Sequence, residues 1–171
     1  SSLADKFDVL CENEGYHRVL CAADVREDAV NVLLTSEGGA FSSLKELETL
    51  YARGVRMAGF VWNTPTAAGY PNFPDYAGLR EGARGLTEFG REAAAFMEER
   101  GMIADVSHGS DALFFEIAAR KRPFVASHSN AASVQNRARN LTDEQIALLA
   151  DCGGVAGLNF CADFLSDDGS A

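Results

Sequence analysis

The sequence contains no run of about 18 consecutive apolar residues, the length that a membrane-spanning helix needs. It also lacks an excess of positive charge, because 15 Lys and Arg residues stand against 25 Asp and Glu residues, a net charge of −10. A polyanion such as DNA would be repelled by that charge. The composition therefore argues against a membrane span and against a nucleic-acid partner.

The four cysteines contain no Cys-x-x-Cys pair, the spacing that is typical of zinc and redox motifs. They are scattered through an ordinary globular composition, which favours free thiols in a reducing compartment. The first residues contain no apolar segment like that of a secretion signal, so we expect a cytoplasmic protein. The sequence also does not begin with Met, which indicates a trimmed or processed chain.

A glycine-rich phosphate loop is missing as well. The first apolar run is followed by Glu37-Gly38-Gly39, which has neither the GxGxxG spacing nor a Lys-Ser/Thr pair. Nucleotide binding is therefore unsupported by this sequence.

What the sequence does contain is a regular alternation of short apolar runs and amphipathic segments. The runs predict buried strands at 30–35, 58–62, 103–106, 124–127 and 155–159, and the segments predict helices at 3–14, 42–53, 87–100, 110–121 and 142–152. Strands of this continuous apolar kind are typical of a parallel sheet covered on both faces by helices. Doubly wound sheets and closed barrels both fit. The long irregular stretch 63–85 exceeds the usual loop length, which indicates a functional role.

Polar side chains follow the predicted strands at their carboxyl ends, where functional groups gather in α/β proteins. Glu37 follows the first strand, and His108 and His128 take equivalent places after the third and the fourth. One carboxylate and two imidazoles suit a divalent metal ion, zinc above all. The alternative is that each histidine is a hydrogen-bonded residue that ends a strand. The remaining histidine, His17, lies in a polar helix or loop and is interpreted as a surface residue.

The motifs GLTEFG, DVSH, SHSNA and RNLTDEQ stand in this order between positions 85 and 145, and SEGG and FVWN precede them. Through these motifs, about residues 30–165 of the chain resemble the membrane (renal) dipeptidase family of zinc peptidases. The resemblance implies a (β/α)8 barrel with two zinc ions at the carboxyl ends of its strands. It also implies hydrolysis of dipeptides, or of related small amides in some members, and it allows a homodimer.

The resemblance also implies roles for six residues of this sequence. Glu37 matches the catalytic carboxylate that bridges the two metal ions, and His108 and His128 match the two imidazoles on one of them. Arg139 matches the arginine that pairs with the carboxylate of the substrate, a role that suits the guanidinium fork. Trp62 stands where some family members have a substrate-contacting histidine, and it is expected, with Asn63, to contact the substrate.

Two family features are absent from this sequence. No H-x-D pair, which completes the second zinc site in the family, occurs anywhere, and nothing after Asn159 resembles the acidic motif of the last strand. A complete (β/α)8 barrel typically has about 250 residues, whereas this chain has 171. We therefore expect 1–171 to be one partial barrel with about five of eight strands: a leading helix and loop (1–29), five β/α units (30–160) and a frayed tail (161–171). A non-catalytic or truncated family member and a hydrolase of other small amides remain alternatives.

Overall fold

The computed structural model of the protein describes residues 3–72 and 84–166. Its main sheet has five parallel strands whose order in space follows their order in the chain. The strands are β3 (Leu34–Ser36), β4 (Val55–Gly59), β5 (Ile103–Asp105), β6 (Val125–Ala126) and β7 (Val155–Ala156). A doubly wound sheet reverses its strand order at a switch point. This sheet has no reversal among its described strands, so its topology is that of a barrel.

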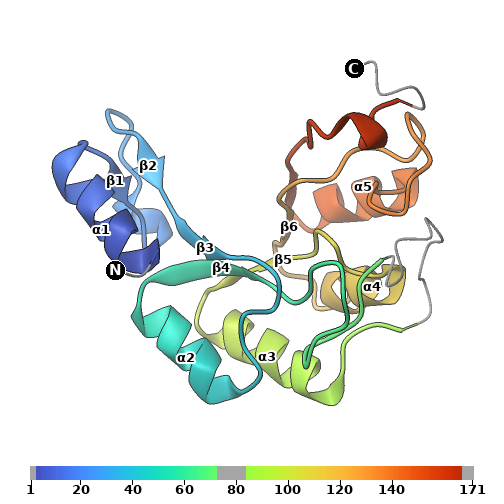
Figure 1. Ribbon diagram of the computed structural model, residues 1–171, viewed down its shortest axis with the longest axis horizontal. Coiled ribbons are helices and arrows are strands. Elements are labelled where there is room, and N and C mark those ends of the chain that lie inside the picture. The colour runs from blue at the N-terminus through green and yellow to red at the C-terminus, as the bar shows by residue number, and fades with distance from the viewer. Residues whose placement is uncertain (1–2, 73–83, 167–171) are drawn as a thin grey trace.

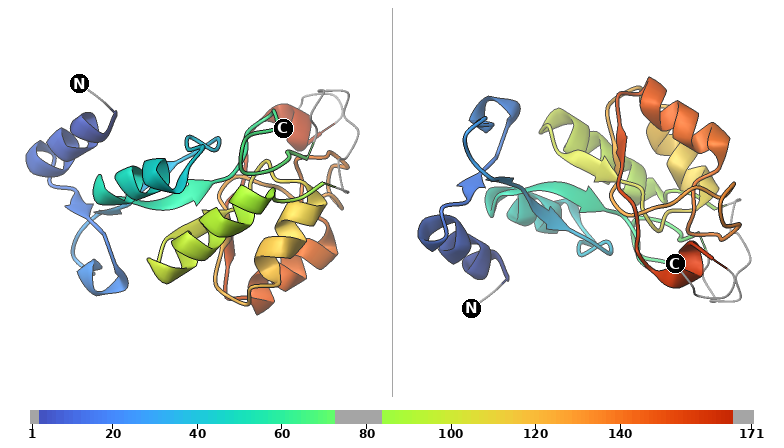
Figure 2. Two further views of the ribbon diagram at one scale, coloured as in Figure 1. Left: turned by 90° about the horizontal axis from the view of Figure 1, so that it is seen from below. Right: turned by 90° about the horizontal axis from the view of Figure 1, so that it is seen from above.

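One helix follows each of the first four strands of this sheet. These are α2 (Leu44–Ala52), α3 (Glu88–Glu99), α4 (Asp111–Ala118) and α5 (Asp143–Asp151). Figure 1 shows them in chain order around the outside of the strands, and in the view from below in Figure 2 α3 and α4 lie nearest the viewer. The described helices thus cover one face of the sheet, not both as a doubly wound fold would require.

The hydrophobic core lies between these helices and the strands. Its largest fully buried side chains include Phe60, Phe114, Phe124, Leu47 and Met97. The rings of Phe114 and Phe124 meet edge to face with centroids 5.3 Å apart, which joins α4 to the start of β6. Burial of this set holds the strand ends in fixed relative positions, which is what the site above them requires.

The helix starts agree with the capping signals of the sequence. Ser43, Thr87, Ser110 and Thr142 each accept a hydrogen bond from the backbone N–H three residues later. Thr142 and Gln145 form the reciprocal capping box that their spacing predicts. Local chemistry therefore decides where each of these helices begins.

The N-terminal strands differ from the prediction. The apolar run 30–35 is divided between β2 (Asn31–Val32) and β3, and β2 pairs with β1 (His17–Arg18) in a separate two-stranded sheet that follows α1 (Leu3–Asn13). His17 is thus a half-buried strand residue whose Nε2 contacts the carbonyl oxygen of Asp24, and not a residue of a polar helix or loop. A short 3-10 helix, η1 (Ala22–Asp24), lies between the two strands.

The second main strand runs over Val55–Gly59 and not over 58–62 as predicted. Arg56 interrupts the apolar pattern, yet its guanidinium lies 4.0 Å from the centroid of the Tyr51 ring and donates to the Tyr51 carbonyl oxygen at 2.8 Å. A charged side chain that is satisfied in this way fits within a strand, which periodicity alone does not reveal.

The C-terminal tail also differs from the prediction. Ala162–Phe164 form a 3-10 helix, η2, and the buried Asn140 amide donates to the Phe164 carbonyl oxygen at 2.9 Å. This part of the tail is ordered against the domain, whereas 167–171 and the middle of the predicted loop, 73–83, lie outside the described residues. The strand predicted at 155–159 is reduced to β7.

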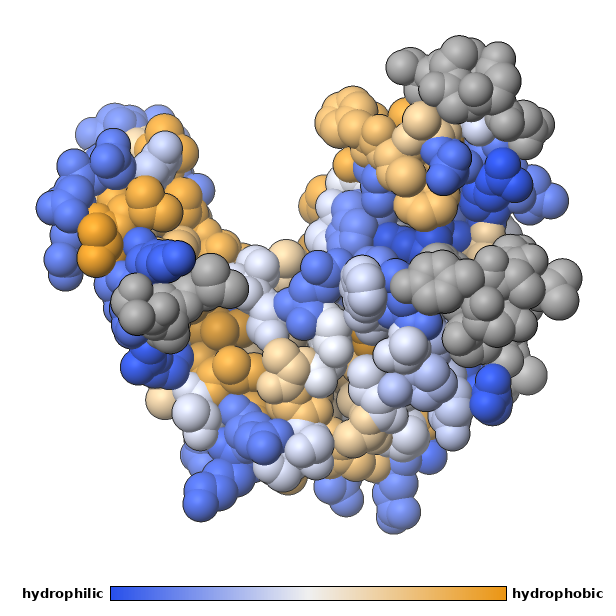
Figure 3. Space-filling model, in the orientation of Figure 1, coloured by the Kyte–Doolittle hydropathy of each residue, from blue (hydrophilic) through white to orange (hydrophobic). Residues whose placement is uncertain are grey.

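The described sheet ends at β3 on one side and at β7 on the other. Figure 3 shows a wide hollow between the N-terminal and C-terminal arms of the molecule. Within β7 and just after it, Val155, Leu158 and Phe160 are 65%, 71% and 87% exposed. The described strands therefore form an open trough and not a closed barrel. No helix within the described ranges is long and apolar enough to cross a membrane.

Candidate metal and substrate site

Three predicted metal ligands meet at the carboxyl ends of the strands. Glu37 follows β3, His108 follows β5 and His128 follows β6. The Nε2 atoms of the two imidazoles lie 3.0 and 3.1 Å from Glu37 Oε1, and 2.9 Å from each other. These are the only described His, Cys, Asp and Glu residues that form a group able to hold a metal ion. Glu37 lies 71 positions before His108 in the sequence, and His128 lies 20 positions after it. They converge because parallel strands of one sheet end at the same edge.

The loop that carries Glu37 depends on glycine. Gly38 and Gly39 have φ angles of 82° and 62°, in the left-handed region that side chains disfavour. A Cβ atom at Gly39 would also collide with the carbonyl oxygen of Phe60. The SEGG motif therefore turns the chain sharply after β3, which places the Glu37 carboxylate over the strand ends.

His108 is held in a strained backbone conformation. Its φ angle is 70°, which costs about 1–2 kcal/mol for a residue other than glycine. Its carbonyl oxygen accepts a hydrogen bond from the Asn72 N–H at 2.8 Å, and its Nδ1 lies 3.0 Å from Asn63 Oδ1. Because an amide oxygen only accepts, Nδ1 carries the proton and Nε2 keeps a lone pair. Asn63, predicted to contact substrate, thus orients an imidazole and also lines the cavity beside it.

The environment keeps His108 uncharged at neutral pH. The residue is 7% exposed. Burial lowers the pKa of its imidazole to about 3, and the positive charge of Arg139 acts in the same direction. A neutral imidazole is the form that binds a metal ion.

Arg139 is a buried cation at the same site. Its guanidinium donates from Nη2 to the His128 carbonyl oxygen at 3.1 Å, while Nη1 is buried with no hydrogen-bond partner. Burial lowers the pKa of Arg139 to about 10, against the opposite influence of Asp105 and Glu37, so the group is charged at neutral pH. A buried N–H without a partner is unfavourable, and the donor left over at Nη1 suits an anionic ligand group.

A cavity of about 580 Å³ connects these groups. It is lined by Glu37, Trp62, Asn63, His108, His128, Arg137, Ala138, Arg139, Asn159, Asp163 and Phe164. Trp62 is 49% exposed at the rim, where its ring lies 6.1 Å from that of His108. All six residues predicted for the site therefore line one cavity.

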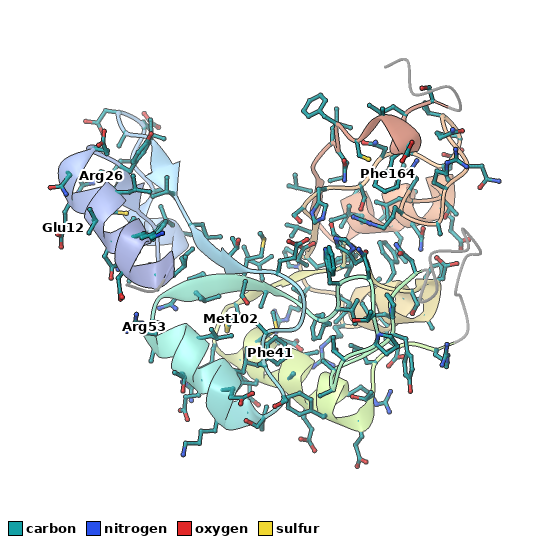
Figure 4. All side chains as sticks on the ribbon, viewed as in Figure 1. Glu12, Arg26, Phe41, Arg53, Met102 and Phe164 are labelled. Carbon is teal, nitrogen blue, oxygen red and sulfur yellow. The ribbon has the colours of Figure 1, made fainter. Side chains whose placement is uncertain are left out.

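Sequence reasoning missed the contribution of the tail. Asp163 and Phe164 line the cavity, and the ring of Phe164 lies 5.7 Å from the Arg139 guanidinium carbon. Figure 4 labels Phe164 on the C-terminal arm, at the end of η2. The single aromatic residue within an acidic stretch was the available signal, since a frayed tail has no need of one.

Comparison with known proteins identifies the arrangement. The family model described as membrane dipeptidase (peptidase family M19) matches residues 5–171. The chain belongs to the membrane dipeptidase family. An uncharacterised protein in the pqqA 5′ region of Klebsiella pneumoniae is 36% identical over 157 residues, which cover 88% of this chain and 58% of that protein. Dipeptidase 3 of Macaca fascicularis is 34% identical over 128 residues, which cover 72% of this chain and 26% of that protein.

Solved structures of membrane dipeptidases have the same fold. Dipeptidase AC, a metallopeptidase of family M19, superposes with a TM-score of 0.83 at 32% identity, covering 97% of this chain and 50% of that one. A metallopeptidase from Rhodobacter sphaeroides, liganded with a phosphinate mimic of the dipeptide L-Ala-D-Ala, has a TM-score of 0.81 at 32% identity, covering 96% and 49%.

The chain thus spans about half the length of these solved relatives. Because membrane dipeptidases are (β/α)8 barrels of the metal-dependent hydrolase type, the five described strands are part of such a barrel. The predicted family and fold class are confirmed.

Proposed function

We propose that this chain supplies half of the active site of a zinc-dependent dipeptidase, with Glu37, His108 and His128 as metal ligands. The supporting observation is the convergence of one carboxylate and two Nε2 atoms beside a buried guanidinium that lacks a partner. One carboxylate with neutral imidazoles is a donor set that zinc accepts readily. Glu37 directs Oε1 toward both histidines, so its carboxylate, which matches the bridging carboxylate of the family, would hold the metal together with them.

Arg139 gives the site its preference for substrates with a free carboxylate. A dipeptide ends in a carboxylate, and the free N–H at Nη1 offers it a charge-assisted hydrogen bond. The backbone bond from Nη2 to His128 fixes the guanidinium relative to the metal ligands. Binding at Arg139 would therefore place the scissile peptide bond at a set distance from the strand ends.

The remaining groups around the cavity orient the reacting parts. Asn63 holds the His108 ring, and Trp62 and Phe164 line the apolar part of the cavity where substrate side chains would pack. A bound zinc ion supplies Lewis-acid chemistry for hydrolysis of the peptide bond. The H-x-D pair of the second zinc site is not in this sequence, so the proposed activity is that of the complete barrel.

The first test measures zinc content and dipeptide cleavage of the complete barrel that carries His108→Ala or His128→Ala. Both variants are expected to hold less zinc than the wild type and to lose cleavage of L-Ala-D-Ala, the dipeptide whose mimic binds the Rhodobacter sphaeroides relative. His17→Ala is the matched control, because His17 lies in β1, outside the ligand group. Unchanged zinc content in both site variants would refute the ligand assignment.

The competing functions predict different results in the same assays. A hydrolase of other small amides would cleave N-acyl amino acids or lactams faster than a panel of dipeptides. A non-catalytic family member would bind less than one zinc ion per chain and cleave none of these substrates.

A further inference from the structure

Asp105, the last residue of β5, is a buried carboxylate that the proposed function does not use. It is 6% exposed. Its Oδ1 accepts hydrogen bonds from the backbone N–H groups of Ser107 and Ser127 at 3.0 and 3.1 Å, while its Oδ2 accepts the Ser127 hydroxyl. The two oxygens of one carboxylate thus have different partners: Oδ1 joins the ends of β5 and β6, and Oδ2 holds a side chain.

The Ser127 hydroxyl connects Asp105 to a proposed metal ligand. Its Oγ lies 2.7 Å from His128 Nδ1. A hydroxyl has one hydrogen, and a carboxylate only accepts, so this hydrogen goes to Asp105. Ser127 Oγ must then accept from His128, which places the imidazole proton on Nδ1.

The consequence appears on the other side of the ring. With its proton on Nδ1, His128 presents a lone pair at Nε2, which lies 3.1 Å from Glu37 Oε1. His108 has the same tautomer through Asn63, and the two Nε2 atoms are 2.9 Å apart. Three acceptor atoms face one another at these distances, an arrangement that a cation between them would stabilise.

We propose that Asp105 is a positioning residue that acts through Ser127 to hold His128 in the tautomer that binds metal. The inference rests on the proposed function, because it takes His128 as a ligand. Metal-bound histidines usually donate their second N–H to a carboxylate, a carbonyl oxygen or water. Here a serine hydroxyl stands between the carboxylate and the ring, so the direction of two hydrogen bonds depends on Asp105.

A purely structural role for Asp105 is the competing explanation, since Oδ1 joins two strand ends. Ser127→Ala separates the two roles, because it removes the hydroxyl and leaves both backbone bonds to Oδ1 in place. Ser127→Thr keeps the hydroxyl and should behave as the wild type.

Asp105→Asn should reverse the hydrogen-bond chain. Two backbone N–H groups face the Oδ1 position, so the amide oxygen must stay there and the NH2 group takes the place of Oδ2. The NH2 group then donates to Ser127 Oγ, which turns its own hydrogen toward His128 Nδ1. The imidazole proton moves to Nε2, where it blocks the ligand atom.

The experiment measures zinc affinity by competition titration and the imidazole tautomers by 15N NMR of the metal-free protein. In the wild type, His128 should carry its proton on Nδ1. Ser127→Ala should lower zinc affinity about 10- to 100-fold, and Asp105→Asn should lower it further and show the proton on Nε2. The double variant, with both Asp105→Asn and Ser127→Ala, should have the zinc affinity of Ser127→Ala alone. Without the Ser127 hydroxyl, the change at Asp105 can no longer reverse the hydrogen bond to His128. Ser129→Ala, which removes another buried hydroxyl nearby, is the control.

Two results would overturn the proposal. A His128 proton that stays on Nδ1 in Asp105→Asn would show that the carboxylate does not set the tautomer. A double variant weaker in zinc binding than Asp105→Asn would show that Asp105 only joins the strands. A wild-type protein that binds no zinc would count against the proposed function, while the NMR tautomers would still decide the role of Asp105.

Discussion

Replacement of Arg139 by Met should stabilise the protein while it weakens dipeptide binding. Arg139 is 3% exposed, and one of its terminal nitrogens is buried without a partner. Met has a similar length, fills the same space and carries no charge. The change therefore removes the desolvation penalty of a buried cation and keeps most of the packing.

The size of the effect follows from the pKa. Burial lowers the pKa of Arg139 from its ordinary value to about 10, which corresponds to an unfavourable contribution of about 3 kcal/mol from the charged form in the folded state. The variant loses the Nη2 hydrogen bond to His128, worth about 1–2 kcal/mol. The net gain in the free energy of unfolding at pH 7 is thus about 1–2 kcal/mol. Each kcal/mol corresponds to a rise of about 2–4 °C in Tm for a domain of this size.

The direction of the pKa shift of Arg139 also determines how the stability difference depends on pH. The folded pKa lies below the unfolded pKa, so the penalty is fully present at neutral pH and is lost as the pH rises through 10. The stability advantage of Arg139→Met should therefore shrink above pH 10. Urea unfolding at pH 7 and at pH 10.5, for both proteins, measures it.

The functional part of the prediction uses substrates with and without a carboxylate. Loss of a charge-assisted hydrogen bond should raise KM for a dipeptide about 10- to 100-fold and leave KM for the corresponding dipeptide amide nearly unchanged. Arg137→Met is the matched control for stability, because Arg137 is partly exposed and already donates to the Asp163 carbonyl oxygen at 2.9 Å. A variant that is less stable than the wild type, or that loses both substrates equally, would refute the reasoning.

Three further predictions concern stability. Gly90→Ala should lower the free energy of unfolding, measured in urea, by about 2 kcal/mol, because its Cβ would collide with the Ala68 carbonyl oxygen. Gly59→Ala is the control and should lower this free energy less, because a Cβ there has ordinary contacts. Thr142→Ala should lower Tm by the equivalent of about 1 kcal/mol through loss of the N-cap of α5, and Thr142→Ser should restore it; equal Tm values for all three would contradict the capping assignment. Because burial lowers the folded pKa of His108 to about 3, the metal-free protein should lose stability by about 1.4 kcal/mol per pH unit as the pH falls from 6.5. His108→Asn should flatten that slope in urea unfolding between pH 4 and 7, and a wild type without the slope would speak against the lowered pKa.

Local chemistry accounts for most of what the sequence predicted correctly. The caps at Thr87, Ser110 and Thr142 act within three residues, so their helices begin where the sequence places them. Strand ends follow apolar runs, and parallel strands end at one edge, so Glu37 and the two later histidines could be brought together without coordinates. The residue patterns alone left two fold classes open, a doubly wound sheet and a closed barrel. The sequence motifs decided between them, because they indicate the membrane dipeptidase family.

The tertiary structure decided what depends on partners distant in the sequence. The run 30–35 is divided because its first half pairs with His17–Arg18, a partner that periodicity does not specify. The tail is ordered because Asn140, 24 positions away, donates to Phe164. A frayed tail and a cavity wall have the same composition, and only packing distinguishes them.

The same division holds within the site. The sequence by itself determined which side chains could bind a metal ion, because that depends on residue type and on position at a strand end. It did not determine which nitrogen of each imidazole carries the proton. For His108 this depends on Asn63, 45 positions away, and for His128 it depends on Ser127, which donates to Asp105, 22 positions away from Ser127. Hydrogen-bond direction is set by contacts between neighbouring strand ends, and such contacts exist only once the sheet has formed.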